Sequence, residues 1–451
     1  MKAVPPRPGP ARPFSPPPFA EARLRSGLVA RAARWGKRPT AAVSVLFPGA
    51  GSASDGAERQ GTAELTADVF LGGTRTKSAR ELATALDDLA AVLDVSAGSD
   101  SSVARLYVLE EDLDAGLALL AEVLTEAVFP EPEFEKSRRR MLDTLTEQRS
   151  EPDFLARERL LDRLYPGHPY GRLTPSERGL LALTRDEVAR FASERLSLAG
   201  ATLLVAGSAD PDRLLRSCET AFGGLPLPAP VTPPAVPAAP PVRGLTLHLV
   251  HRTGSVQTNL LFARPALPRR HPRYLELLAA NQSLGGGASS RLFNVLREEK
   301  GLTYGASSSL TPRVAAGHFG ASIDCRTEVT KDALEGLLGL VRTYAEEGPT
   351  PEEHERSLRY LSGTFVLSRE APGAIVQDEV SRLLHGLPDD EWATWRDRLR
   401  AVSPAAARAA AREFFDPSVG VLAAVGDAEK LRPVLEPFGD VTLWDADGPR
   451  G

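Results

Sequence analysis

The stretch "LPLPAPVTPPAVPAAPPVR", residues 225–243, divides the sequence into two nearly equal halves. Its eight prolines lack an amide donor and favour the extended polyproline conformation, so it is expected to be a semi-rigid linker. A chain of 451 residues also exceeds the usual size of a single hydrophobic core. The sequence therefore predicts a Pro-rich N-terminal tail over residues 1–35, one domain over 36–224, the linker, and a second domain over 244–451.

The two halves share an order of signals. Each opens with a β-rich run, at residues 40–47 and 245–251, and continues into stretches with helical spacing of apolar residues. "FPEPEFEKSRRRML" (residues 129–142) and "GPTPEEHERSLRYL" (residues 348–361) share a Pro-x-Pro start followed by mixed charges. This pattern indicates an internally duplicated α+β unit: a mostly antiparallel sheet with helices packed on one face. Two such domains joined by a linker would form a clam-shell with its functional surface between them.

Two neighbouring stretches of the first half illustrate how the elements are assigned. Leu82, Leu86, Leu89 and Leu93 recur at helical spacing, which predicts a helix over residues 78–93. The following stretch, "DVSAGSDSSVARLYVL", alternates between apolar and polar residues and is expected to form a pair of strands.

Composition limits the classes of function. Of the residues, 42% are hydrophobic and 25% charged, and the net charge of −5 gives no electrostatic reason to bind nucleic acid or an anionic membrane. Cys218 and Cys325 lie far apart, which suits a reducing compartment rather than a disulfide framework. The Pro-rich start lacks a signal-peptide core, and no run of 18 apolar residues occurs. A cytoplasmic protein without a membrane span is the expectation.

The stretch "GTAELTADVFLGGT", residues 61–74, carries the candidate chemistry of the first half. It reads as a helix that starts after a Gly-rich turn and stops at Gly-Gly-Thr. Glu64 and Asp68 lie one helical turn apart, so their carboxylates would share one face.

In the second half, "SLGGGASSRLFNVLREEKGLTYGASSS" (residues 283–309) is the most specific stretch. It resembles the C-terminal domain of the pitrilysin-type M16 zinc peptidases, in the two-domain bacterial and mitochondrial-processing-peptidase-like branch. Residues 61–74 stand where that family has Gly-x-Ala-His-x-x-Glu-His-x-x-x-x-Gly-Thr, and "LYPGHPYGR" (residues 164–172) follows in family order. The resemblance covers nearly the whole chain beyond the first 35 residues.

The resemblance implies a zinc site that this sequence lacks. In the family, two His one turn apart bind zinc, the Glu between them activates water, and a later Glu completes the ligands. The matching positions here are Glu64, Ala67, Asp68 and a residue at or near Asp143. All four differ, zinc prefers imidazole and thiolate to carboxylates, and a methyl group cannot accept a proton from water. We expect no metal or other cofactor in this chain.

Two other interpretations of these positions remain open. Glu64, Asp68 and Asp143 could together hold a harder ion such as Mg²⁺ or Ca²⁺, which would give an active peptidase with an atypical carboxylate site. Alternatively, the three are solvated or mutually paired residues of a chain that is purely a structural or peptide-binding scaffold. His168, in "PGHPYG", is expected to be a turn residue rather than a ligand.

Arg297 and Tyr304, in "LREEKGLTYG", are the candidate catalytic residues. The resemblance implies that this pair faces the zinc across the cavity, holds the substrate backbone and stabilises the oxyanion. A plainer interpretation places Arg297 at a helix end, where a positive charge suits the dipole, and Tyr304 in a strand core.

Paired chains of this branch suggest the function. One chain carries the zinc and the other carries the Arg-Tyr pair. The sequence therefore predicts a non-catalytic subunit, a pseudoenzyme that lends Arg297 and Tyr304 to a zinc-bearing M16 homologue in a heterodimer acting on peptides. Zinc is expected in that partner. The resemblance also assigns residues 93–108 to a strand beside which substrate peptide can add, but without a catalytic centre beside it we favour an ordinary sheet edge.

Overall fold

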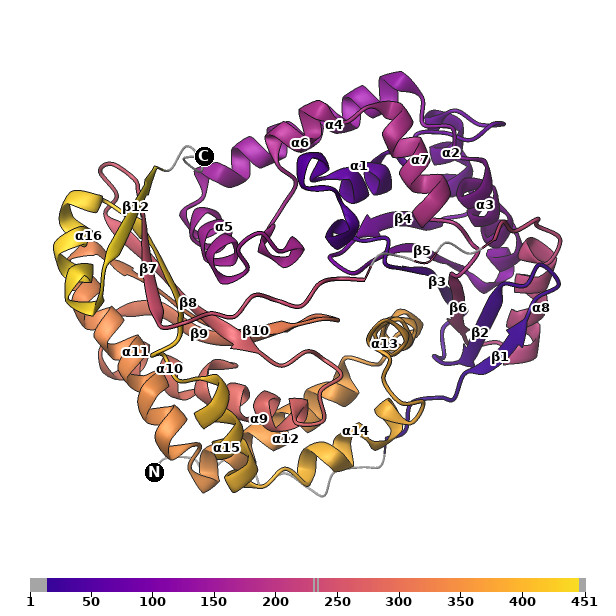
Figure 1. Cartoon of the computed structure of the whole chain (residues 1–451). Coiled ribbons are helices and arrows are strands. Elements are labelled where there is room, and N and C mark those ends of the chain that lie inside the picture. The colour runs from indigo at the N-terminus through magenta and orange to yellow at the C-terminus, as the bar shows by residue number, and fades with distance from the viewer. Residues whose placement is uncertain (1–13, 230–231, 233–234, 446–451) are drawn as a thin grey trace.

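The chain folds into two halves that face one another across a central space (Figure 1). The structure, a computed structural model, describes residues 14–229, 232 and 235–445. Each half contains a six-stranded, mostly antiparallel sheet with helices, which confirms the predicted α+β class and the pair of similar domains. In Figure 1 the first half is indigo to magenta, and most of the second half is orange to yellow.

The first sheet has the strand order β1-β2-β6-β3-β5-β4. All its neighbouring strands are antiparallel except β2 and β6. The central strand β3 is buried along almost its whole length, because helices cover both faces of the sheet. Its strands are β1 (Ala20–Arg23), β2 (Val29–Arg34), β3 (Thr40–Pro48), β4 (Val92–Ala97), β5 (Ser101–Leu109) and β6 (Thr202–Gly207).

The second sheet repeats this arrangement with the order β12-β7-β11-β8-β10-β9. Here β7 runs parallel to β11 and β12, and the other neighbours are antiparallel. Position by position, β4 at the free edge of the first sheet corresponds to β9 at the free edge of the second. The strands are β7 (Leu245–His251), β8 (Gln257–Ala266), β9 (Thr303–Pro312), β10 (Gly317–Arg326), β11 (Gly420–Gly426) and β12 (Val441–Asp445).

Each sheet packs one face on helices of its own half and forms a separate apolar core there. In the first half these are chiefly α1 (Thr62–Val69), α3 (Leu113–Glu126), α7 (Arg185–Arg195) and α8 (Pro211–Phe222), with α2 (Ala79–Asp88), α4 (Glu131–Ser150) and α6 (Glu177–Ala182) around them. In the second half they are α9 (Tyr274–Gly285), α10 (Arg291–Phe293), α11 (Thr330–Glu347), α15 (Pro404–Phe414) and α16 (Ala428–Leu435), with α12 (Pro351–Leu367) and α14 (Glu391–Arg400) beyond.

The other face of each sheet is covered by one helix from the opposite half. Helix α5 (Pro152–Leu164) packs on the second sheet, where it forms a core with β7, β8 and β11. Helix α13 (Pro372–His385) packs in the same way on β3 and β6 of the first sheet. Figure 1 shows both helices in the space between the two sheets. The halves therefore exchange helices, and each completes the other's sheet.

The duplicated sequence stretches occupy equivalent places. Residues 129–142 begin α4 and residues 348–361 begin α12, and each helix has a Pro in its first turn. Each is followed by the exchanged helix, α5 or α13, which also begins at a Pro. Proline suits the first turn because its missing N–H would have no partner there.

The expected tail over residues 1–35 is too long. Residues 1–13 lie outside the described residues, whereas residues 20–34 form β1 and β2 of the first sheet. The sequence of β2, "VARAAR", does not predict a strand clearly, because alanine has a low strand propensity. Its alternate residues Ala30 and Ala32 are nevertheless fully buried against the core.

Contacts around Tyr170 join the two halves, between a turn of the first sheet and a turn of the second. The Tyr170 hydroxyl donates to Asp100 Oδ1 at 2.5 Å and accepts the backbone N–H of Ala315 at 3.1 Å. Asp100 Oδ2 also accepts the N–H of Val314, and the Arg313 guanidinium stacks on the Tyr170 ring. The β4–β5 turn, the short helix η4 (Pro169–Gly171) and the β9–β10 turn are thus held together. We call these contacts the Tyr170 junction.

Within the part of the chain that the structure describes, none of the helices combines the length and the apolar character needed to cross a bilayer.

Candidate functional site

Helix α1, which carries three of the candidate positions, is held at its start by Asp55. Gly61 precedes the helix with φ +105°, a left-handed conformation that favours glycine. The Asp55 carboxylate accepts the backbone N–H groups of Gly61 at 2.9 Å and Ala63 at 3.1 Å. A negative charge suits this end of a helix, where N–H groups are otherwise unpaired.

Glu64 lies half-buried on α1, close enough to Asp55 for the two carboxyl groups to interact. Burial raises the pKa of Glu64, and its Oε2 is buried without a hydrogen-bond partner among the described residues. Burial also raises the pKa of Asp55 to about 7, and the nearby Glu64 carboxylate adds to that shift. Arg172 is the cation close enough to oppose both shifts. The two carboxyl groups at the start of α1 therefore both have raised pKa values, and burial is the main cause in each.

Asp68, one turn beyond Glu64, is engaged by an arginine. Arg140 Nη2 lies 2.5 Å from both carboxylate oxygens of Asp68. The two side chains are 57% and 30% exposed, so this is a surface ion pair that contributes little to stability. Arg140 nevertheless contacts both of the Asp68 oxygens that a metal ion would need as ligands. Ala67, which lies between Glu64 and Asp68 in the sequence, is buried, with 5% of its surface exposed.

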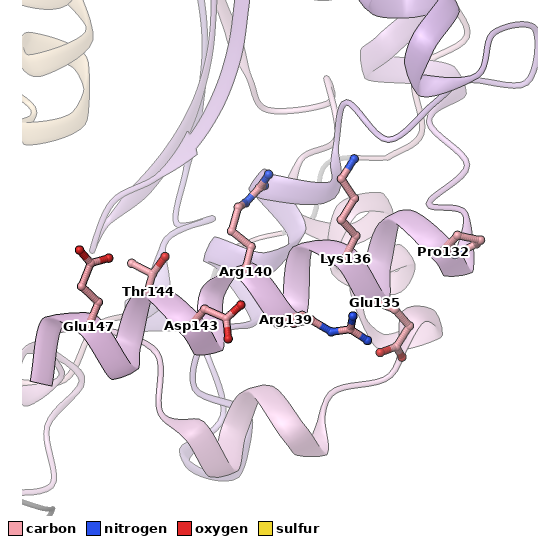
Figure 2. Close-up of a pocket in the computed structure, with 8 residues that line it drawn as sticks. All are labelled: Pro132, Glu135, Lys136, Arg139, Arg140, Asp143, Thr144 and Glu147. Atoms are coloured by element: carbon pink, nitrogen blue, oxygen red, sulfur yellow. The ribbon is translucent and has the colours of Figure 1, made fainter.

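Asp143 does not join these residues. It is exposed on α4, and Figure 2 shows it pointing to a different side of that helix from Arg140. Arg140 and Thr144 are four residues apart and share one side, the side on which Arg140 reaches Asp68. The eight residues in Figure 2 line a shallow pocket of about 420 Å³ on α4.

These positions do not fit a metal ion. Among the described residues, no group of three or more His, Cys, Asp or Glu side chains lies close enough to hold one. Glu64 is pushed toward its protonated form, Asp68 is paired with Arg140, and Asp143 faces elsewhere. A zinc ion would moreover meet no imidazole or thiolate at α1. Glu64, Asp68 and Asp143 therefore do not form, in the described part of the chain, the shared metal site that an atypical carboxylate peptidase would need.

Arg297 lies in a distorted helix that leads directly into β9. The six residues Asn294–Glu299 (η5) form a π-helical turn, a rare geometry that occurs frequently at functional sites. The Arg297 guanidinium stacks 4.6 Å above the Phe293 ring and lies 3.5 Å from Glu298. Its side chain is 42% exposed, so stacking restricts its position while its donors remain accessible.

Tyr304 is 92% exposed, which excludes the interpretation of a strand-core residue. Strict alternation back from the buried residues Ser308 and Ala306 would turn it toward the core. However, the register between β9 and β10 shifts here: Ala306 is paired with Ile323 but Thr303 with Cys325. One extra residue therefore lies on β9, and such a bulge re-aims a side chain. Both Tyr304 and Gly305 are exposed as a result.

The edge strands β4 and β9 are the other candidate binding elements. The stretch over residues 93–108 forms β4 and β5, as expected, and β4 is the outer strand of its sheet. A free edge exposes backbone donors and acceptors that can pair with an extended peptide. The Thr303 hydroxyl donates to the Asp324 carbonyl and to the Gly305 carbonyl and so fixes the start of β9.

Several residues of this region are not predicted by the sequence alone. Asp55 and Arg140 contact α1 from 8 and 72 residues away, and no periodic pattern indicates such contacts. Tyr170 and Arg172 lie in the quoted "LYPGHPYGR" stretch, which is the one signal that could have indicated them. His168 of that stretch is a turn residue: its Nδ1 accepts the N–H of Tyr170 and its Nε2 lies 3.0 Å from the Pro237 carbonyl.

Comparison with known families decides the relationship. The family model described as insulinase (peptidase family M16) matches residues 34–175, and the model described as the peptidase M16 inactive domain matches residues 182–361. The chain belongs to peptidase family M16. It retains the order of both M16 domains, and its α1 falls within the first of them.

M16 relatives with bacterial sources are similar over most of the chain. A Streptomyces coelicolor protein named as an uncharacterized zinc protease is 26% identical over 397 residues, which cover 85% of this chain and 84% of the relative. A Bacillus subtilis protein of the same description is 25% identical over 72% of this chain and 78% of its own length.

Two solved structures share the M16 fold with this chain. One, from Pseudomonas fluorescens, is described as a peptidase M16 inactive domain; it has a TM-score of 0.84 at 23% identity and covers 91% of this chain and 98% of its own. A Helicobacter pylori protease has a TM-score of 0.82 at 18% identity, over 91% and 99%. Identity at this level establishes the fold alone.

Proposed function

We propose that this M16 chain is the non-catalytic subunit of a two-chain peptidase, and that it supplies Arg297 and Tyr304 to the active site of a zinc-bearing M16 partner. The observation that carries the proposal is the contrast between its two halves. At the metal-motif helix the first half has Ala67, an Asp68 that is paired with Arg140, and a Glu64 whose pKa burial raises. The second half keeps an accessible Arg297 and, seven residues later in the sequence, an exposed Tyr304 that a strand bulge has re-aimed.

Chemistry supports this division of labour. A phenol and a guanidinium are hydrogen-bond donors suited to an oxygen that gains negative charge during attack on a peptide carbonyl. Neither group can activate water, and Ala67 cannot act as a base. The chain alone is therefore expected to bind no stoichiometric zinc and to cleave no peptide. Elemental analysis and a peptidase assay of the purified chain test this, and one chelatable zinc per chain with activity would contradict the proposal.

The decisive experiment uses the complex with a zinc-bearing homologue from the same genome. Co-expression should give a single 1:1 species in size-exclusion chromatography. Within that complex, Tyr304→Phe removes one donor and keeps the ring, and it should lower turnover by about 10²–10³-fold. Arg297→Ala should cost at least as much and should also raise KM, because a charge-assisted contact to substrate is lost.

Two control variants separate this role from general damage. Lys300→Ala removes an exposed cation three residues from Arg297 and should leave turnover unchanged. Asp68→Ala breaks only the surface pair with Arg140 and should also leave turnover unchanged, with a stability loss of at most about 1 kcal/mol. If complexes carrying Tyr304→Phe or Arg297→Ala assemble and cleave like the wild type, the pair is structural and the scaffold interpretation is correct.

A further inference from the structure

A pocket of about 490 Å³ in the first half is lined by arginines and by Ala57, Glu58 and Gln60, which precede α1 in the chain. It is bounded by the end of α4, by α5, and by the segment that contains η4 and residues 171–179. Helix α5 lies in the space between the two halves (Figure 1). The charged residues that line the pocket are Glu58, Arg149, Glu158, Arg159, Asp162, Arg172 and Arg178.

The arginines outnumber the acids in this pocket. Each of the three acidic residues forms an ion pair within the lining: Glu58 with Arg178, Glu158 with Arg149, and Asp162 with Arg159. Four arginines against three acids leave one positive charge, in a chain whose net charge is −5.

Arg159, on α5, is a buried residue of the pocket lining. It is 5% exposed, its guanidinium lies 3.4 Å from the centre of the Trp444 ring, and its Nη1 donates to Asp162 at 3.0 Å. Arg163 donates to the same Asp162 oxygen, so two cations share one carboxylate. The Nε–H of Arg159 is buried and no described residue accepts it.

Arg149 and Arg172 add donors to the same lining. The Nε–H of Arg149 is also buried without an acceptor, and its contact with Glu158 is 3.4 Å long. Arg172 donates to the Asp55 carbonyl at 2.9 Å but forms no ion pair with any described side chain. Asp55 and Glu64 interact with Arg172 electrostatically, and burial raises the pKa of both carboxyl groups.

From this arrangement we propose that the pocket is a binding site for a single carboxylate of a peptide. Arg172 has donors left over after its one backbone contact, and a carboxylate can accept two parallel N–H donors from a guanidinium. One excess positive charge matches one carboxylate better than a dianionic phosphate. The carboxylate is either the C-terminus of the peptide or an Asp or Glu side chain.

The inference deepens the proposed function, on which it rests for the nature of the ligand. The pocket lies in the metal-motif half, where residues just before α1 line it, whereas Arg297 and Tyr304 belong to the other half. A carboxylate held there would anchor one end or one side chain of a peptide inside this chain. Selection for acidic or C-terminal residues would then come from the non-catalytic subunit.

Binding of labelled peptides to the isolated chain tests the site. Four N-terminally fluorescein-labelled heptapeptides of one Ala/Ser sequence are compared by anisotropy: central Glu or Gln, each with a free C-terminal acid or an amide. We expect at least one carboxylate-bearing form to bind at least tenfold more tightly than the Gln amide. The Gln acid and the Glu amide show which carboxylate is held.

Variants locate that binding. Arg172→Gln and, independently, Arg149→Gln should reduce the affinity of the preferred peptide to that of the Gln amide, with thermal unfolding as a check on folding. The matched control is Arg139→Gln, an exposed arginine on α4 outside this pocket. If the Gln amide binds as tightly as every other form, or if both folded pocket variants bind like the wild type, the inference is wrong. Because no partner chain is present, this outcome is independent of complex formation and of the Tyr304 assay.

Discussion

Asp55 couples the stability of the metal-motif helix to pH. Its carboxylate accepts two backbone N–H groups at the start of α1, yet burial, with Glu64 nearby, raises its pKa from 3.8 to about 7. The folded state therefore binds a proton more tightly than the unfolded state between these two values. Stability from this group is complete below about pH 4 and is lost as pH rises toward 7.

We predict that the free energy of unfolding falls across this window by up to about 4 kcal/mol, at about 1.4 kcal/mol for each unit of pKa difference. Glu64, whose pKa burial also raises, contributes with the same sign. Asp55→Asn should flatten the profile, since the amide keeps one acceptor for the cap and does not titrate. Urea unfolding at several pH values between 4 and 8 measures the slope. A wild-type profile no steeper than that of the variant would contradict the assignment.

The candidate residues could be named from the sequence through the M16 resemblance, and helical spacing added that Glu64 and Asp68 share a face. Glu64 and Asp68 do lie one turn apart on α1. Their partners were not accessible, since Asp55 and Arg140 reach α1 through tertiary contacts that no local pattern encodes. The exposure of Tyr304 likewise depends on a bulge, and alternation in the sequence would have turned it inward.

At the scale of elements, one helix predicted from the spacing of leucines is longer than the helix in the structure. The spacing of Leu82, Leu86 and Leu89 predicts α2, but the structure ends this helix at Asp88 and places Leu93 in β4. Ala90 has φ +46°, a conformation that no helix continues through. A leucine on the buried face of an edge strand can fall in step with a preceding helix, so periodicity alone did not locate the boundary.

The Tyr170 junction is an element-scale contact with a measurable role. Tyr170→Phe leaves the half-buried Asp100 and Ala315 without the hydroxyl that joins them, a loss of about 0.5–1.5 kcal/mol for each hydrogen bond. The β4–β5 turn and the β9–β10 turn should then separate more often.

Hydrogen exchange of the purified chain measures this prediction. Amides of residues 98–101 and 313–316 should exchange faster in Tyr170→Phe, whereas those of α11, remote from the junction, should be unchanged. Tyr165→Phe, which removes a longer 3.3 Å contact with His318, is the matched control and should have a smaller effect on both turns. Equal exchange in all three proteins would show that the junction does not hold the turns.

At the scale of the whole molecule, the sequence predicted two similar halves but not their exchange of helices. Apolar residues on α5 and α13 show that each helix buries a face, and nothing local states against which sheet. The duplicated order of elements places the two helices at equivalent points of each half. Only the assembled structure shows that each crosses to the opposite sheet.

This exchange predicts that neither half folds alone. A fragment of residues 1–229 would lose Ile375, Val376 and Val380, which α13 buries on its sheet. Burial of each such side chain stabilises by about 1.5–3 kcal/mol, so roughly 5–9 kcal/mol would be lost. A native domain has only about 5–15 kcal/mol in total. Residues 230–451 would in turn lose the cover that α5 gives to the second sheet.

Expressed separately, the two fragments should aggregate or fail to unfold cooperatively in circular dichroism. Expressed together, they should co-purify as one 1:1 species with the helix content of the intact chain, because the cut lies in the linker and leaves both exchanged helices in place. A control cut within one half, between α7 and β6, should prevent recovery, since β6 lies between β2 and β3 in the first sheet. A monomeric, cooperatively folded fragment of either half would show that the exchanged helix is dispensable.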